Sequence, residues 1–161
     1  MFSETHDTDV PASVMEELDQ GILPGLLGRQ IRLTYLAAFR LVEERLAAFN
    51  ITPQQFSLLT IVERNPGSRQ SLLAKARGLD KSTLVPMIDR LERDGMVERR
   101  PMATDRRIRT IWITERGRAV LADAIPAVQD GDRAIGSNLS ASEQQEFRRL
   151  LEKVRLGLTD R

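Results

Sequence analysis

The sequence predicts a mainly α-helical fold that carries one small β-hairpin. Within residues 68–114, two short helix patterns are separated by a tight turn and are followed by two alternating segments, 96–100 and 111–113. Two helices joined by a glycine-containing turn are typical of a helix-turn-helix, and the alternating segments suit a hairpin. Apolar residues at helical spacing on both sides of this stretch predict flanking helices. The expected α+β architecture is a winged helix-turn-helix core with N- and C-terminal helices around it.

The ends of the two short helices are marked by specific residues. The first helix is expected over residues 70–77 and stops at Gly78, because glycine readily takes the left-handed conformation that follows a helix. Asp80 can then cap the second helix, since its carboxylate can accept from backbone N–H groups of the first turn. The apolar face of the second helix is expected to be Leu84, Ile88 and Leu91.

A further core helix is predicted to begin after Thr52. Thr52 can cap it, Pro53 suits the first position, and Gln55 can reach back as in a capping box. Its buried face is expected to be Phe56, Leu59 and Val62. Residues 51–114 thus make up the predicted winged-helix lobe.

The flanking segments 21–50 and 115–161 are predicted to be dimerisation helices. The first helix, from about Pro24 to Asn50, is apolar over most of its circumference and needs cover on more than one side. A second subunit explains this economically, and a central helix of a monomer is the alternative. After Thr114 a helix should carry Leu121, Ile125, Val128, Ile135 and Leu139, and a last helix, opened by a capping box at 140–143, should carry Phe147, Leu150, Leu151, Val154 and Leu158.

Length and composition set the broad class of protein. We expect a single domain over residues 21–161, preceded by a flexible acidic leader over residues 1–20. The absence of cysteine excludes thiol chemistry, and the only histidine, His6, lies in the leader, so no metal site is expected. With no apolar run near 18 residues and no secretory signal pattern, we expect no membrane association and a cytoplasmic location.

Positive charge is concentrated in the predicted winged-helix lobe. Residues 69–109 have eleven Lys or Arg against six Asp or Glu, whereas the whole chain has a net charge of only +1. Residues 1–20 contain six acidic residues and no Lys or Arg. The excess positive charge therefore lies where a surface facing DNA phosphates needs it, and residues 51–114 are predicted to be a DNA-binding lobe.

Three parts of this region resemble the MarR family of transcription regulators. They are the run LDKSTLVPMIDRLERDGMVERR, the loop TDRR and the junction ITERGRAVL, in that order. The resemblance covers roughly residues 50–122. It implies a homodimer that binds a near-palindromic site in double-stranded DNA, acting most often as a repressor released by a small-molecule effector. It also implies one recognition helix per subunit in a major groove.

The resemblance places the recognition helix after Asp80. Its candidate DNA contacts are Lys81, Ser82, Thr83, Pro86 and Arg90. Arg69, outside this helix, is either a further phosphate contact or a solvated charge. Short hydroxyls and cations near a helix N-terminus can approach bases and phosphates closely, although capping is an alternative purpose for Ser82 and Thr83. Pro86 departs from the family pattern, since proline cannot donate a hydrogen bond to a base. Either the helix starts late, near Ser82, or its first turn is bent.

The wing is expected from Pro101 to about Arg109. Arg106, Arg107 and Arg109 have only Asp105 beside them, and a narrow minor groove attracts arginine. The resemblance implies that Arg107 enters the minor groove, that Asp105 orients its guanidinium, and that Arg106 and Arg109 contact phosphates. A merely soluble hairpin tip is the alternative.

The resemblance further implies an effector pocket between the dimerisation helices and the DNA-binding lobe, which often takes aromatic acids, phenolic compounds or CoA thioesters. The residues that could line it are Arg29, Arg32, Tyr35, Phe39, Arg40, Phe56 and Trp112. Core packing or surface charge is the alternative for each of them. No cofactor is expected.

Two other classes of function compete with a DNA-binding regulator. An enzyme is not expected, because the sequence has no catalytic triad, cysteine nucleophile, metal cluster or glycine-rich phosphate loop. A winged-helix protein–protein adaptor without specific DNA binding is the alternative. The wing arginines favour DNA over the adaptor, which has little need of three cations at one exposed tip.

Overall fold

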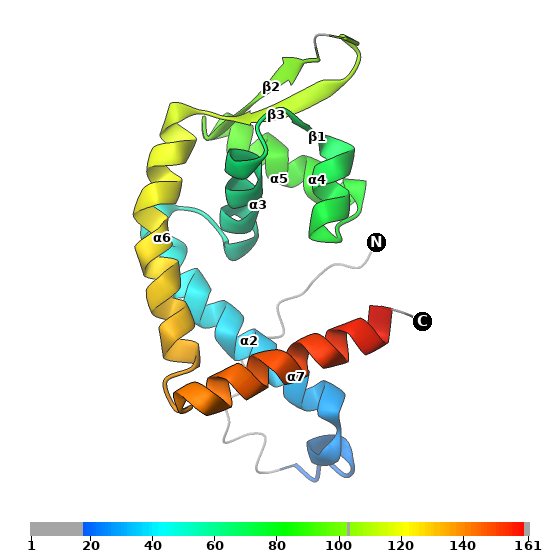
Figure 1. Cartoon of the computed structure of the whole chain (residues 1–161), viewed down its shortest axis with the longest axis vertical. Coiled ribbons are helices and arrows are strands. Elements are labelled where there is room, and N and C mark those ends of the chain that lie inside the picture. The colour runs from blue at the N-terminus through cyan, green and yellow to red at the C-terminus, as the bar shows by residue number, and fades with distance from the viewer. Residues whose placement is uncertain (1–17, 103, 160–161) are drawn as a thin grey trace. The chain divides into compact units, whose positions relative to one another are not determined.

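The computed structural model describes residues 18–102 and 104–159, and these described residues divide into two compact units between Ala38 and Phe39 (Figure 1). The predicted acidic leader therefore lies almost wholly outside the described residues. The first unit contains η1 (Leu23–Gly25) and the start of α2 (Leu27–Leu46). The second unit continues with η2 (Ala47–Phe49), α3 (Pro53–Arg64), β1 (Ser68–Arg69), α4 (Gln70–Arg77), α5 (Lys81–Arg93), β2 (Val97–Pro101), β3 (Arg109–Ile113), α6 (Glu115–Ile135) and α7 (Ala141–Thr159).

The expected helix-turn-helix is confirmed with its end signals. Helix α4 ends at Arg77, and Gly78 follows in the left-handed conformation with φ 62°. Helix α5 begins after Asp80, whose side chain accepts from the Thr83 N–H. The capping box that opens α3 is also present, because the Thr52 hydroxyl accepts from Gln55 N and the Gln55 side chain accepts from Thr52 N. These local interactions fix where each helix of the lobe starts.

The sheet has one strand more than the sequence predicted. Strands β2 and β3 form the expected antiparallel hairpin, with Pro101 opposite Arg109, and β1 pairs with the other edge of β3 to give the order β1-β3-β2. Strand β1 has only two residues, Ser68 and Arg69, so no alternating pattern could mark it. It anchors the start of α4 to the sheet.

The core of the lobe lies between its helices and the inner face of the sheet. Every apolar residue predicted for the inner face of α5 is at most 1% exposed, as are Leu59 and Val62 of α3. Phe56 is only partly buried, and Leu58 takes the buried place beside Leu59 instead. Ile111 and Ile113 of β3 complete the core from the sheet side.

The first long helix is shorter than its periodicity predicted. Leu26 takes an extended conformation that separates η1 from α2, and Asn50, with φ 54°, ends η2 in the left-handed region. The apolar row predicted for the helix after Thr114 also extends beyond the observed helix, because α6 ends at Ile135 with Gly136 as its C-cap. Leu139 instead lies in the following turn, where its carbonyl accepts from the Gln144 side chain at 3.1 Å.

Helix α7 opens with the predicted capping box, in which Ser140 N donates to the Glu143 carboxylate at 2.8 Å. The Ser140 hydroxyl and N–H hold the pKa of Glu143 below its ordinary value. The apolar side of α7, formed by Phe147, Leu150, Leu151, Val154 and Leu158, is 36–68% exposed in the single chain. No helix within the described residues is long and apolar enough to cross a bilayer.

Candidate nucleic-acid interface

The N-terminus of α5 is organised by Asp80. The Ser82 hydroxyl donates to its carboxylate at 2.7 Å, and the Thr83 N–H donates to the same oxygen at 2.7 Å. These hydrogen bonds hold the pKa of Asp80 below its ordinary value of 3.8. Ser82 therefore has a capping purpose in the free protein, and its hydroxyl must leave Asp80 before it can donate to a base.

The other candidate residues of α5 lie on its solvent-exposed surface. Lys81, Thr83, Pro86 and Arg90 are all exposed. Helix α5 begins at Lys81, one residue before the late start near Ser82 that was one of the two alternatives, and Pro86 lies inside the helix. Pro86 has no N–H for the Ser82 carbonyl, so one intrahelical hydrogen bond is lost. Arg90 lies further along α5, and its Nε is 2.8 Å from the Asp94 carboxylate.

Two backbone hydrogen bonds shape the loop of the wing. Met102 N donates to the Ile108 carbonyl at 2.9 Å, and Ile108 N donates to the Asp105 carbonyl at 3.0 Å. The Asp105 carboxylate accepts from the backbone N–H of Arg107 at 3.0 Å. The expected bidentate pair between Asp105 and the Arg107 guanidinium is therefore not formed. Asp105 is positioned to hold the backbone on which Arg107 is carried.

The wing arginines are open to an external partner. Arg106, Arg107 and Arg109 are exposed, and among the described residues no carboxylate lies within ion-pair distance of any of them. Arg69, which occupies the N-cap position of α4 without making a side-chain capping hydrogen bond, is also exposed, and its Nη2 is 3.9 Å from the Met102 sulfur at the base of the wing. Arg69 thus lies beside the wing.

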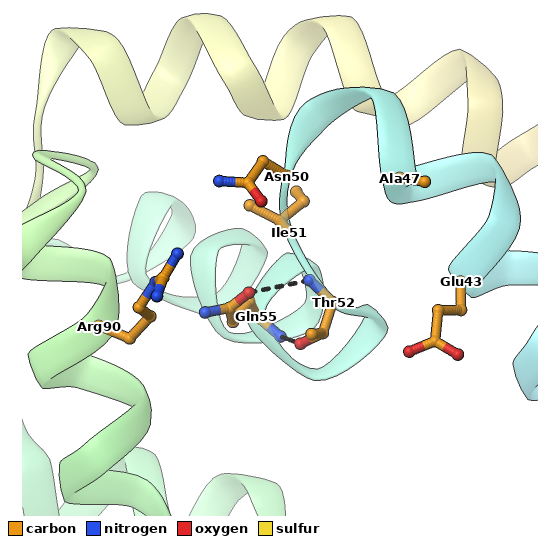
Figure 2. Close-up of a pocket in the computed structure, with 7 residues that line it drawn as sticks. All are labelled: Glu43, Ala47, Asn50, Ile51, Thr52, Gln55 and Arg90. Carbon is orange, nitrogen blue, oxygen red and sulfur yellow. Dashed lines mark hydrogen bonds between the residues drawn. The ribbon is translucent and has the colours of Figure 1, made fainter.

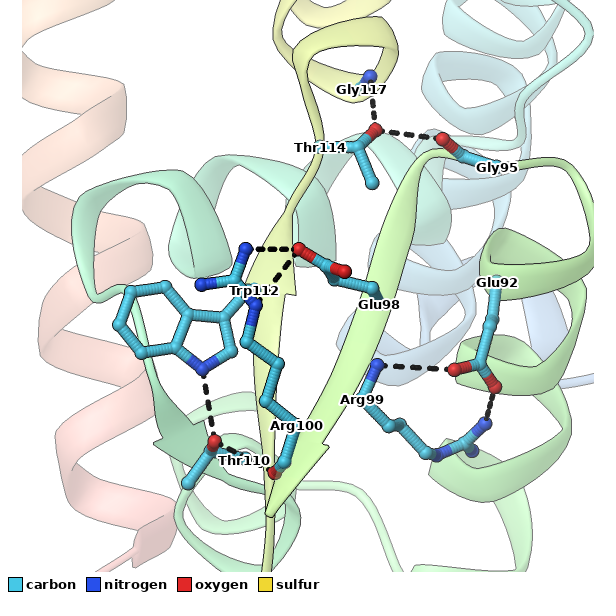
Figure 3. Close-up of polar contacts among 9 residues, drawn as sticks. All are labelled: Glu92, Gly95, Glu98, Arg99, Arg100, Thr110, Trp112, Thr114 and Gly117. Carbon is cyan, nitrogen blue, oxygen red and sulfur yellow. Dashed lines mark hydrogen bonds and ion pairs between the residues drawn. The ribbon is translucent and has the colours of Figure 1, made fainter. Parts of the chain in front are cut away.

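The wing and the recognition helix are joined by Arg99 of β2, which the sequence did not single out. Its guanidinium pairs with Asp89 at 2.5 Å and with Glu92, both on α5, and its backbone N–H donates to Glu92 at 3.1 Å. With the Gln70 amide oxygen turned toward it, Arg99 Nε also donates to α4 at 2.9 Å. One side chain thus connects β2 to both helices of the helix-turn-helix. Figure 3 shows its contacts with Glu92.

The outer face of the hairpin is stabilised around Trp112. The Arg100 guanidinium lies 4.8 Å from the centroid of the Trp112 ring, and Trp112 Nε1 donates to the Thr110 hydroxyl at 2.9 Å. Thr110 in turn donates to the Arg100 carbonyl at 3.1 Å (Figure 3). The ring packs against Gly67, where an added Cβ would lie 2.8 Å from it. The Trp112 side chain is therefore held in place by its contacts with Arg100, Thr110 and Gly67.

A compact junction connects the lobe to α6. The Thr114 hydroxyl donates to the Gly95 carbonyl at 2.7 Å and accepts from Gly117 N at 3.0 Å (Figure 3). A Cβ at Gly117 would lie 2.1 Å from the Met96 carbonyl oxygen, so only glycine fits there. Thr114 was predicted as the cap of this helix. The requirement for glycine at Gly117 was not predicted, because it arises from a contact with Met96, which is distant in sequence.

The residues predicted for an effector pocket are distributed over several elements. Arg29, Arg32 and Tyr35 belong to the first unit, and Arg29 donates to the Gln20 side chain. Phe39, Arg40, Phe56 and Trp112 belong to the second unit, where Phe39 and Phe56 are half-buried, Arg40 is exposed, and Trp112 is engaged by Arg100 and Thr110. Two cavities of the second unit, one beside Arg90 and one beside Arg69, contain none of the seven.

Known proteins share both this sequence pattern and this fold. A sequence model of the MarR family matches residues 51–108. A Thauera aromatica protein assigned to transcriptional regulation of the hcr operon is 32% identical over 143 residues, which cover 88% of this chain and 86% of the relative. A cysteine-to-serine mutant of Escherichia coli MarR, in a complex with operator DNA, is 31% identical with a TM-score of 0.78, covering 85% of this chain and 99% of its own. The chain belongs to the MarR family.

Membership of the MarR family makes this chain a relative of transcription regulators and not of enzymes. The repressor CouR, solved with a 23-mer DNA duplex, has a TM-score of 0.80 and 29% identity, covering 86% of this chain and 98% of that chain. CouR has also been solved with p-coumaroyl-CoA, again with a TM-score of 0.80. MarR-family neighbours are thus known in both DNA-bound and effector-bound forms.

Proposed function

We propose that this MarR-family protein is a homodimeric repressor of transcription that binds a near-palindromic operator and is released by a small-molecule effector. The exposed wing carries the proposal, because it presents three arginines without carboxylate partners among the described residues. Cations held at one tip without local partners are suited to the minor groove and its phosphates. The DNA complexes of CouR and MarR support the same assignment.

In this proposal the N-terminus of α5 enters the major groove. Lys81, Ser82 and Thr83 are its base- and phosphate-contacting residues. Pro86 can make only an apolar contact with a base, because it has no N–H to donate. Arg107 enters the minor groove, with Asp105 holding its backbone. Arg69, Arg90, Arg106 and Arg109 contact phosphates.

The homodimer is supported by the apolar surface that the single chain leaves exposed. Every residue of the α7 stripe is at least 36% exposed, which is costly in water. Residues 21–50 and 115–161 would cover each other across the two-fold axis, while 51–114 bind DNA. The dimer would set the distance between recognition helices at about one turn of DNA, roughly 10 bp. A regulator of this kind acts where the genome is, which supports a cytoplasmic location.

The effector is proposed to be an aromatic acid, a phenolic compound or a CoA thioester. The p-coumaroyl-CoA complex of CouR supports this class. Arg29, Arg32 and Arg40 of α2 are suited to an acidic group of such a ligand, and Tyr35, Phe39 and Phe56 to its ring. Trp112 is the weakest of these candidates, because Arg100 and Gly67 already contact its ring.

The test is binding of the full chain to the promoter region upstream of its own gene, measured by fluorescence anisotropy across a series of salt concentrations. Log affinity should fall by about 0.9 per neutralised phosphate for each unit of log salt. Arg107→Ala should abolish specific binding while the dimer stays intact by analytical ultracentrifugation. A flat salt response and unchanged affinity for Arg107→Ala would instead support a protein–protein adaptor.

A further inference from the structure

The carboxylate of Asp80 is only partly used by the helix that it caps. Its Oδ1 accepts from the Ser82 hydroxyl and from the Thr83 N–H, both at 2.7 Å, and neither hydrogen bond uses Oδ2. The Thr83 hydroxyl adds a further interaction that helps to lower the pKa of Asp80. A carboxylate has about four acceptor positions, so Asp80, which is exposed, can accept another hydrogen bond from an external partner.

Asp80 differs from the acidic residues further along this helix because it forms no ion pair with an arginine. The others are all paired within the lobe: Asp89 and Glu92 with Arg99, and Asp94 with Arg90. Arg90 extends from α5 toward Gln55 at the start of α3, far from the N-terminus of α5 (Figure 2). No Lys or Arg of residues 18–102 and 104–159 lies within ion-pair distance of Asp80. The end of α5 that is proposed to enter the major groove therefore carries an unpaired carboxylate.

Capping alone does not account for a carboxylate at this position. Asparagine and serine cap helices about as well as aspartate does. A negative charge adds a small stabilisation at a helix N-terminus, but the same charge is repelled by the phosphates that border a DNA groove. A neutral cap would leave α5 nearly as stable and would bind DNA more tightly. The charge of Asp80 is suited to this surface if the carboxylate contacts a base.

The four bases offer a carboxylate different partners in the major groove. Cytosine presents the N4 amino group, which donates hydrogen bonds, and adenine presents the N6 amino group with the acceptor N7 beside it. Guanine presents the acceptors O6 and N7, and thymine presents the acceptor O4. Because a carboxylate can only accept, it is stabilised by cytosine, less well by adenine, and is repelled by guanine and thymine.

We propose that Asp80 is a specificity-determining residue whose Oδ2 accepts from the N4 amino group of one cytosine in each half of the operator. Oδ1 stays with Ser82 and Thr83, which hold the carboxylate in one orientation. This inference rests on the proposed function, since it requires the N-terminus of α5 to enter the major groove. Asp80 lowers the affinity for DNA in general and excludes guanine and thymine at one position, so it favours the operator over other sequences.

The experiment is selection of binding sites by the full-chain dimer from DNA duplexes of random sequence, followed by sequencing of the bound pool. The selected pool gives the base preference at every position of the operator. Affinities for the selected duplex and for substituted duplexes are then measured by fluorescence anisotropy at one salt concentration. Replacing the cytosine by thymine or guanine should weaken binding roughly tenfold in one half-site and roughly a hundredfold in both, because mismatches at separate positions add.

Asp80→Asn converts the free acceptor into a donor. The side-chain oxygen of asparagine can still accept from the Thr83 N–H and cap the helix, while its NH₂ group takes the place of Oδ2. The preferred base should therefore change from cytosine to guanine or thymine, whose O6 and O4 accept. Asp80→Ser keeps a cap but is too short to reach the base, so the preference at this position should disappear. Both variants should bind DNA of unrelated sequence more tightly, since a negative charge is removed.

Asp94→Asn is the matched control, because it removes a carboxylate at the other end of α5. By releasing Arg90 it should change the affinity for all duplexes alike and leave the preference for cytosine unchanged. If Asp80→Asn selects the same operator as the unaltered protein, Asp80 is only a helix cap and the specificity proposal alone is wrong. If the unaltered protein enriches no sequence, the repressor proposal fails and this one fails with it. A changed preference at an unchanged midpoint of thermal denaturation supports base contact, since the fold is then intact.

Discussion

Arg99→Met tests whether one side chain positions the recognition helix against the wing. Methionine keeps an unbranched apolar stem of similar reach and removes the guanidinium. The Arg99 side chain is 19% exposed, and its carboxylate partners Asp89 and Glu92 are 48% and 38% exposed. Hydrogen bonds to charged groups contribute about 1.5–3 kcal/mol when well buried, but solvent screening at half-exposed carboxylates reduces each to about 1 kcal/mol or less. Two such pairs give an expected loss of about 2 kcal/mol.

The assay is urea denaturation of the dimer at fixed protein concentration, followed by circular dichroism. The matched control is Arg100→Met, one residue along β2, whose guanidinium is more exposed, pairs with Glu98 on the same strand and stacks on Trp112. It should cost about 1 kcal/mol or less, because it joins no separate helix to the sheet. If Arg99→Met is no less stable than Arg100→Met, the proposed role of Arg99 in joining β2 to α5 is wrong.

The salt dependence of operator binding distinguishes a residue that positions the recognition helix from one that contacts DNA. Arg99 is turned toward α5 and α4, so its loss should weaken operator affinity without changing the slope of log affinity against log salt. Loss of Arg107 should reduce that slope by about 0.9, because a neutralised phosphate is given up. A reduced slope for Arg99→Met would mean that Arg99 meets DNA directly, contrary to its contacts in the structure.

Three further results are expected. Gly117→Ala should destabilise the protein by about 3 kcal/mol in thermal denaturation, because the new Cβ would lie 2.1 Å from the Met96 carbonyl oxygen; a loss under about 1 kcal/mol would contradict that packing. Thr52→Ala should cost about 1 kcal/mol in urea, since it removes half of a capping box. The pKa of Asp80 is lowered in the folded protein, so its contribution to stability is complete above pH 3.8 and is lost as the pH falls through the pKa of the folded state. Asp80→Asn should therefore flatten the dependence of stability on pH in that range. An unchanged acid denaturation profile would argue against the charged cap.

Local chemistry explains which features could be predicted from the sequence. Gly78, Asp80, Thr52 and the alternating strands each act on neighbours within a few residues, so their pattern can be interpreted before the chain is folded. The two-residue strand β1 has no periodicity of its own and exists because β3 has a free edge. Its presence therefore depends on tertiary structure.

In the candidate site too, features that depend on neighbouring residues could be predicted, whereas contacts between distant residues could not. The wing and the N-terminus of α5 were predicted because charge and small polar residues are visible in the sequence. The contacts of Arg99 with Asp89, Glu92 and Gln70 were not, since these residues are separated by 7 to 29 positions and nothing in the pattern pairs them. The Asp105 pairing was predicted with the wrong partner atom, because the choice between a guanidinium and a backbone N–H depends on the turn.

The pairing of the arginines suggests how affinity and specificity are shared in this lobe. Arg90, Arg99 and Arg100 are all held by carboxylates of the same lobe, so drawing any of them to DNA costs an existing ion pair. The wing arginines have no such pair within residues 18–102 and 104–159, and they should supply most of the salt-dependent affinity. Recognition of the operator then depends on α5, whose position relative to the wing is set by Arg99.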